Sequence, residues 1–456
     1  MKNKSNRDLL LNGSIVKAIL TLAIPVVINS FLQTMYNLTD TYWLGKLGTE
    51  ELAAINLVTP VQNIIINFGS GITVAGSVLI SQYLGAKKDE DARSMANQIF
   101  TCALIFSVVC ASLCAAATPG IVTWLGAEGL TWQCGKTYLQ LVILDMPFLY
   151  TVNMYTAINQ AQGDTVRPML LNLAGITLNL ILDPVLIFGF NMGISGAAIA
   201  TIFSQFVSFV ILLVLVVRSG NVLKPSPRYF TLQGWVYKEI FSAGMPTLGR
   251  QGLASVASVL LNVAASGFGD AAVAAMSIVT RIMMFINSAL IGFGQGFQPV
   301  CGFNFGAGLY ERVLESYFFC RRVALVFLLV MGIVMFAIST PIMTLFRKED
   351  PEVIRIGALA LKMQCCLLPF QSYTIIGNML TQSIGYSLRA TLTAISKQGL
   401  FFIPAILILP SLLGIPGLQL AQPVADGLTF VLTQVIVVMV VKELRKMAAS
   451  QNRDTE

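Results

Sequence analysis

Two aspartates lie inside long apolar stretches of this sequence, where a charged side chain is costly. Asp40 falls in LTDTYWLGKLG, which closes an apolar run that begins at Ile15, and Asp183 falls in LNLILDPVLIFGF. A charged Asp near the centre of a bilayer costs about 2.5–3.5 kcal/mol on insertion scales. Burial disfavours the ionised form of a carboxyl group, so such a residue can exchange a proton near neutral pH. The chain has no histidine, so carboxylates must carry any proton chemistry.

Polar side chains accompany both aspartates. Asn179 lies four residues before Asp183, on the same helix face, and can hydrogen-bond the carboxyl group in either protonation state. Pro184 frees a carbonyl group one turn earlier, so the helix can bend there. Other polar residues in the same half of the chain are Tyr36, Asn37, Asn153 and Thr201. These residues predict one polar chamber in the first half of the chain. The alternative is that both aspartates sit at helix ends near water.

Two further acidic residues lie within apolar stretches. Asp145 precedes Pro147 near the outer end of its predicted helix, and we expect it to be solvated or to cap a helix. Asp426, in AQPVADGLTF, is deeper and is either a structural hydrogen-bonding group or a functional, substrate-binding group. Arg250 and Arg281 also fall in apolar stretches, where long cationic side chains usually extend toward water or face a cleft.

The composition places the chain in the membrane. Of its 456 residues, 55% are hydrophobic and 11% are charged, and the mean hydropathy is +0.75. Soluble domains carry about 25% charged residues. Apolar stretches of membrane-spanning length recur along the whole chain, and they are continuous rather than alternating. We therefore predict an all-α, multi-pass integral membrane protein and exclude a β-barrel.

Several functional classes are disfavoured by the same composition. The eight cysteines show neither metal-ligand spacing nor a disulfide framework, so no metal and no cofactor is expected. The net charge of +7 comes from loops and tails, and it does not indicate nucleic-acid binding. No nucleophile or metal constellation lies at membrane depth, so an enzyme is not indicated. The sequence has no loop that resembles the selectivity filter of a channel, so a channel is not indicated. No cleavable signal peptide is visible.

Apolar runs between polar breaks predict twelve transmembrane helices. They lie near 15–42, 52–82, 93–118, 137–160, 168–190, 194–217, 239–265, 273–304, 314–341, 353–383, 388–412 and 416–442. With both termini in the cytoplasm, 21 of the 29 lysines and arginines fall on the cytoplasmic side. The excess of positive charge on that side favours this orientation. The charged stretch RKED, at 347–350, argues mildly against it.

The two halves of the chain form an internal repeat. A shift of 221 or 222 residues aligns Pro25 with Pro246, Gly48 with Gly269, Thr59 with Thr280, Gly196 with Gly417 and Gly163 with Gly385. Each half holds six spans, so both halves have the same orientation, which suits alternating access across a central cleft. We predict an N-lobe at 1–217, a cytoplasmic linker at 218–238 and a C-lobe at 239–456.

The repeat bears directly on the two aspartates. Asp40 corresponds to Leu261, and Asp183 corresponds to Pro404. The scaffold therefore builds the same helices without a carboxylate in its other half. Packing alone is a poor explanation for either aspartate, and the residues mark a pathway.

The chain resembles the MATE (multidrug and toxic compound extrusion) family. The matching stretches include AIPVVINSFLQTMYNLTDTYWLGKLGTEELAAINL, NQAQGDTVRPMLLN, GFGQGFQPVCGFNFGAG and IPGLQLAQPVAD, and together the matches cover nearly the whole length. Within the family, the chain looks closest to the DinF-like branch. That branch carries an acid in its first helix and an Asn-x-x-x-Asp motif in its fifth. The resemblance assigns these positions to Asp40, Asn179 and Asp183, with Thr201 in the sixth helix.

The resemblance implies a cation-coupled antiporter of the cytoplasmic membrane. The expected coupling ion is H⁺, with Na⁺ as the alternative, and the expected substrates are drug-like, often cationic amphipathic compounds. A monomer is expected. The NorM-like branch has acids in its seventh and tenth helices, where this chain has Arg250–Gln251 and QSYTIIGNMLTQSIG. A competing hypothesis is a flippase of lipid-linked precursors, which would use a cationic cleft with residues such as Arg250 and Arg281.

Overall fold

The computed structural model describes residues 2–218, 233–347 and 350–455, and all regular secondary structure in these ranges is helical. Most of the predicted linker at 218–238, and two residues of the RKED stretch, lie outside the described residues. The predicted domain limits stay a prediction.

The first half of the chain forms one short helix and six spans. The short helix α1 was not among the predicted elements, and the fourth span consists of two helices, α5 and α6. The helices are α1 (Lys2–Asn12), α2 (Ile15–Leu44), α3 (Thr49–Gly85), α4 (Asp89–Trp124), α5 (Gly129–Leu144), α6 (Met146–Ala161), α7 (Val166–Pro184), the π-helix η1 (Val185–Gly189) and α8 (Gly193–Arg218).

The second half follows the same plan with more interruptions. Its helices are α9 (Gly234–Ser266), α10 (Asp270–Gly306), α11 (Tyr310–Ala337), α12 (Ser339–Phe346), α13 (Pro351–Leu367), the 3₁₀-helix η3 (Leu368–Phe370), α14 (Gln371–Ser383), α15 (Ser387–Ile395), the π-helix η4 (Ser396–Phe402), α16 (Ile403–Leu413) and α17 (Ile415–Thr455). The eleventh span is thus α15, η4 and α16 in sequence.

Most of the predicted spans have the length and hydropathy that a membrane requires. Ten helices of the described chain meet this requirement, and the count becomes eleven if α5 and α6, which are bent by 41° relative to each other, form one span. The remaining predicted span corresponds to α9, a continuous helix that carries Lys238, Glu239 and Arg250.

The chain divides into two compact units. Unit 1 comprises Met1–Leu9 and Ile24–Gly244, and unit 2 comprises Leu10–Ala23 and Met245–Glu456. One division lies inside α1, and the other two fall next to a proline, Pro25 in α2 and Pro246 in α9, which are equivalent in the repeat. A proline inside a helix removes one backbone hydrogen bond and favours a kink.

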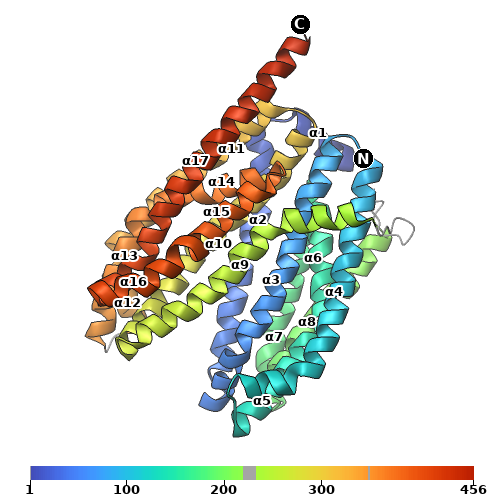
Figure 1. The fold of residues 1–456 in the computed structure, drawn as a ribbon. Helices are drawn as coiled ribbons and strands as arrows, with labels where there is room; N and C mark the ends of the chain where they lie inside the picture. Colours follow the sequence, from blue (N-terminus) through green and yellow to red (C-terminus); the bar gives the residue numbers. More distant parts are fainter. Residues whose placement is uncertain (1, 219–232, 348–349, 456) are drawn as a thin grey trace. The chain divides into compact units, whose positions relative to one another are not determined.

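Within each unit, neighbouring helices pack along their length (Figure 1). In unit 1, α3 packs against α4, α5 and α6, and α7 packs against α8. In unit 2, α10 packs against α11, α13 and α14, and α17 packs against α13, α14 and α16. A buried apolar cluster joins α3, α4, α5 and α8, through residues such as Val58, Val122, Leu139 and Ala198, to the end of α2 at Leu44 and to η1 at Ile187.

Two equivalent glycines allow a close approach of backbones in both halves. At Gly196, near the start of α8, a Cβ atom would lie 2.8 Å from the carbonyl carbon of Leu186. At Gly417, near the start of α17, a Cβ atom would overlap the backbone of Leu409 and lie 2.8 Å from the nitrogen of Pro410. Each glycine therefore lets one span of its unit turn tightly into the next.

We expect Gly417→Ala to lower the thermal unfolding midpoint of the detergent-purified protein. The added methyl group can be accommodated only if the backbone moves, which costs about 1–3 kcal/mol. The control is Gly252→Ala in α9, where no atom lies within 4 Å of the new Cβ. Equal midpoints for the two variants would show that the close approach at Gly417 does not contribute to stability.

Candidate functional site

An N-lobe cluster, defined as Tyr36, Asp40, Asn179, Asp183 and Thr201, brings together side chains of α2, α7 and α8. Asp183 is fully buried, Asn179 is 2% exposed, and Asp40 is half-buried. Asp40 lies close enough to Asp183 for the two carboxyl groups to interact electrostatically. Two carboxyl groups on different helices therefore share one buried environment.

Asn179 connects the aspartate of α7 to α8. One end of its amide lies 3.0 Å from Oδ2 of Asp183, and the other end lies 3.3 Å from the backbone nitrogen of Thr201. A carboxylate accepts and a backbone N–H donates, so the amide nitrogen faces Asp183 and the amide oxygen faces Thr201. The Thr201 hydroxyl donates to the carbonyl oxygen of Ala197 at 3.1 Å. Tyr36 adds a hydroxyl group that interacts with the Thr201 side chain.

The helix that carries Asp183 changes geometry directly after it. Pro184 ends α7, and the chain continues as the π-helix Val185–Gly189, which Phe190 closes with a hydrogen bond from its N–H to the carbonyl oxygen of Val185 at 3.0 Å. Proline cannot donate the helical hydrogen bond to the carbonyl group four residues earlier. π-Helical turns are frequent at functional sites. Asp183 thus lies directly before a break in the regular α-helical geometry of its span.

Two residues that the sequence analysis did not assign to this site lie beside it. Tyr138 of α5 is buried and lies within electrostatic range of Asp40 and Asp183. Asp145, between α5 and α6, is 5% exposed, and its Oδ1 atom has no hydrogen-bond partner. Asp145 also interacts with Tyr36 across the lobe.

The expectation that Asp145 is solvated or caps a helix is wrong. Its side chain makes no capping hydrogen bond. The physical reason is the length of the fourth span, which begins at Gly129 rather than near 137. At about 1.5 Å per residue, Asp145 lies roughly 24 Å along the span, well inside the bundle.

Two other predicted residues do not join the cluster. Asn37 lies three residues before Asp40 on α2, but its side chain is exposed. Asn153 is half-buried on α6, and among the described residues no hydrogen bond joins it to Asp40 or Asp183. The polar side chains that lie near the two aspartates therefore come from α2, α5, α7 and α8.

A second buried carboxylate lies in unit 2, in a C-lobe cluster defined as Gln371, Lys397, Gln422 and Asp426. Asp426 is 4% exposed. Its Oδ2 accepts from Nε2 of Gln371 at 2.9 Å, and its Oδ1 accepts from Nε2 of Gln422 at 2.9 Å. The ammonium group of Lys397 lies 3.3 Å from Oδ1. Sequence reasoning missed Lys397, because a span residue gives no sign of a partner on another helix.

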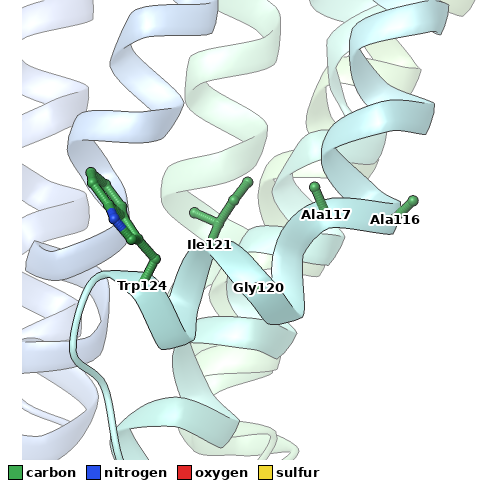
Figure 2. A pocket seen from close by; sticks show the side chains of 5 residues that line it. All are labelled: Ala116, Ala117, Gly120, Ile121 and Trp124. Carbon is green, nitrogen blue, oxygen red and sulfur yellow. The ribbon is translucent and has the colours of Figure 1, made fainter.

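The two arginines and the pocket on α4 offer fewer groups for binding or proton exchange. Arg250 is half-buried on α9, and Arg281 is exposed on α10. Figure 2 shows a shallow apolar pocket on α4, lined by Ala116, Ala117, Gly120, Ile121 and Trp124. It contains no ionisable side chain. The described residues contain no group of three or more His, Cys, Asp or Glu side chains that could hold a metal ion.

Comparison with known proteins identifies the scaffold. A family model described as MatE matches the chain twice, over residues 25–185 and 246–407. The two matches start 221 residues apart and end 222 apart, the same offsets as the internal repeat. The chain is 26% identical to "Multidrug export protein MepA" of Staphylococcus saprophyticus, over 93% of this chain and 94% of that protein. It is 25% identical to the MepA protein of Staphylococcus aureus, with 93% of each chain covered.

Solved structures share the whole fold. A structure described as a MATE protein in complex with MaL6 superposes with a TM-score of 0.91 at 25% identity, covering 96% of this chain and 99% of that one. A MOP superfamily transporter from Pyrococcus furiosus superposes with a TM-score of 0.90 at 25% identity, covering 96% and 98%. These matches confirm the prediction of an all-α membrane protein with two six-helix lobes. The chain belongs to the MATE family, and it is therefore a multi-pass membrane transporter rather than an enzyme.

Proposed function

We propose that the chain is a secondary antiporter of the cytoplasmic membrane that exchanges a proton for drug-like, often cationic amphipathic compounds. The names of its relatives support export, since the staphylococcal proteins are multidrug export proteins. We place the chain in the DinF-like branch, on Asp40 and the Asn179-x-x-x-Asp183 motif. A monomer contains both lobes, so no second copy is needed for the exchange.

The observation that carries the proposal is the pair of carboxyl groups, Asp40 and Asp183, in one buried cluster. Two negative charges in a low-dielectric environment repel each other, so the ionised pair favours a bound cation. A proton and a cationic substrate both satisfy this requirement. If they compete for the same carboxylates, each enters as the other leaves, and the two fluxes are coupled.

The neighbourhood of Asp183 provides a way to convert protonation into movement. An ionised Asp183 accepts a hydrogen bond from the Asn179 amide, whereas a protonated Asp183 donates one. A protonated carboxyl group keeps an acceptor oxygen, but where its O–H donates to the Asn179 amide oxygen, that oxygen turns toward Asp183 and releases the backbone N–H of Thr201. Pro184 and the π-helix that follows allow α7 to adjust its bend. A two-state element of this kind can link a local charge change to alternating access.

Sodium coupling is the alternative for the same cluster. Carboxylate, amide and hydroxyl oxygens are the ligands that hard cations prefer. Asp40, Asp183, Asn179 and Thr201 offer all three types of oxygen. The gradient that drives transport distinguishes the two ions.

We expect Asp40→Asn and Asp183→Asn each to reduce gradient-driven export of a fluorescent organic cation by about a hundredfold or more, because each removes a carboxyl group that must exchange charge. Transport is measured in everted membrane vesicles, with a pH gradient or a sodium gradient imposed separately. The matched control is Asp270→Asn, which makes the same chemical change at an exposed residue at the start of α10.

The gradients give separate outcomes. Transport driven by the pH gradient alone, and lost in both variants, supports proton exchange at the N-lobe cluster. Transport driven by sodium alone would replace H⁺ with Na⁺ in the proposal. Full transport by both variants would contradict any coupling role of this cluster.

The proposed orientation has its own test. Because most lysines and arginines fall on the side assigned to the cytoplasm, we expect both termini to lie there. A green fluorescent protein fused after Glu456 should fluoresce, whereas alkaline phosphatase at the same position should be inactive. Fusions to a chain truncated after Ala127, between α4 and α5, should give the reverse pattern. An active phosphatase after Glu456 would invert the orientation.

A further inference from the structure

The C-lobe cluster contains a buried anion with its own cation. Three groups surround the Asp426 carboxylate, and all three are donors: two amides at 2.9 Å and the Lys397 ammonium at 3.3 Å. A carboxylate is acceptor-only, so this arrangement suits the ionised form of Asp426. Lys397 is its counter-ion.

Packing does not account for this ion pair. A buried ion pair generally gives no more stability than apolar side chains of similar size, because both ions must lose their hydration. The repeat supports the same conclusion, since Asp426 corresponds to Gln205 in the other half. The scaffold therefore forms this helix without a carboxylate, and the charge in the C-lobe needs another explanation.

Aromatic rings lie one helical turn from the carboxylate. Phe430 follows Asp426 by four residues on α17, on the same face. Its ring centroid lies 4.8 Å from that of Phe370 and 5.5 Å from that of Tyr373. The side chains of Phe370, Tyr373 and Phe430 are all partly accessible. An anion beside aromatic faces is the combination that recognises organic cations, through charge pairing and cation–π contacts.

Cationic side chains of the protein itself already lie beside the carboxylate and beside the aromatic rings. Lys397 forms an ion pair with the Asp426 carboxylate, and the guanidinium of Arg321 lies 5.0 Å from the centroid of the Tyr373 ring. A substrate cation must compete with them. The structure thus presents a cation-binding environment whose sites are filled by the chain itself.

Lys397 is the occupant that can leave. Its side chain is 20% exposed, its contact with Asp426 is longer than either amide contact, and its stem is flexible. It sits on the π-helix Ser396–Phe402, which packs against α17. If Lys397 moves away, both amide donors still hold Asp426 in place. In addition, the Oε1 atom of Gln371 is buried and has no hydrogen-bond partner, so an acceptor beside the carboxylate is free for an N–H group of a ligand.

We propose that Asp426 is the anionic group of a second binding site for organic cations, that its resting occupant is the ammonium group of Lys397, and that a cationic substrate binds there by displacing Lys397. This inference rests on the proposed function in one respect, the cationic nature of the substrate. It adds a site in the other lobe and assigns Lys397 the role of a tethered competitor.

The test is binding of ethidium, a fluorescent aromatic cation with amino groups, to the detergent-purified full-length chain. Binding is followed by fluorescence anisotropy in an Asp40→Asn/Asp183→Asn background, so that the N-lobe carboxylates do not contribute. Lys397→Met removes the competitor but keeps an apolar stem. If Lys397 occupies Asp426 about nine-tenths of the time, Lys397→Met tightens binding about tenfold.

Two further variants show whether a change in ethidium affinity arises from the Asp426 carboxylate. Asp426→Asn should weaken binding about tenfold or more, with or without Lys397→Met, because the competitor matters only when the carboxylate is present. Lys362→Met, on α13, removes one positive charge from the same unit without touching Asp426, and it should leave the affinity unchanged. The double variant Lys397→Met/Asp426→Asn contains no unpaired ion, so it keeps the test valid if Asp426→Asn alone does not fold.

Other results would overturn the proposal. Equal affinities for the parent and the Lys397→Met variant would show that Lys397 does not compete for the site. Tightening by Lys397→Met that persists in the double variant would mean that Lys397 acts through general charge rather than through Asp426. Both results leave the proposed function intact, whereas a native chain that binds no organic cation at all would contradict both.

Discussion

The cost of placing a carboxylate inside an apolar helix bundle shapes both lobes of this transporter. A buried charge must be neutralised, paired or hydrogen-bonded, since the interior offers little solvation. The N-lobe holds Asp40 and Asp183 within electrostatic range of each other, and the neutral amide of Asn179 hydrogen-bonds Asp183. The C-lobe holds one carboxylate, Asp426, and supplies it with an internal cation, Lys397. The two lobes meet the same constraint by different chemistry.

This difference is informative because the two lobes are copies of one scaffold. The family model matches both halves at the offset that the sequence repeat predicts. Features shared by the halves, such as Pro25 and Pro246 or the close approaches at Gly196 and Gly417, belong to the scaffold. Features that differ, above all the carboxylates and their partners, are the ones to which we assign the proposed function. Among the described residues no cation pairs with Asp40 or Asp183, as the proposed exchange requires, whereas Asp426 in the C-lobe pairs with Lys397.

The sequence predicted the scaffold well, for clear physical reasons. The positions of the spans can be predicted from the length of the apolar runs. The repeat can be recognised from glycines and prolines near helix ends, where other residues are poorly tolerated. Asn179 was found because its partner lies four residues away on the same helix. Local relations of this kind can be read from a single sequence.

Relations between helices could not be read in the same way. Lys397 and Asp426 lie on different spans, and only the packing of η4 against α17 brings them together. Asp145 was placed too near the water because the start of its helix, Gly129, lies in a stretch of mixed polarity. Tyr138 gave no signal, since a tyrosine in a span is usually a packing residue. Asn37 was assigned by its spacing to Asp40, but its side chain is exposed, and Asn153 was assigned as a polar residue of the fourth span.

In the proposed exchange, a substrate cation and a proton compete for the N-lobe carboxylates. The most direct measurement is the release of protons when an organic cation binds to the purified protein, followed with a pH-indicator dye in weakly buffered detergent solution near neutral pH. The account predicts release of about one proton per cation bound, through linkage of the two binding events, and its loss when Asp40 and Asp183 are both replaced by asparagine. Tight binding of the cation with no proton released by the native chain would contradict it.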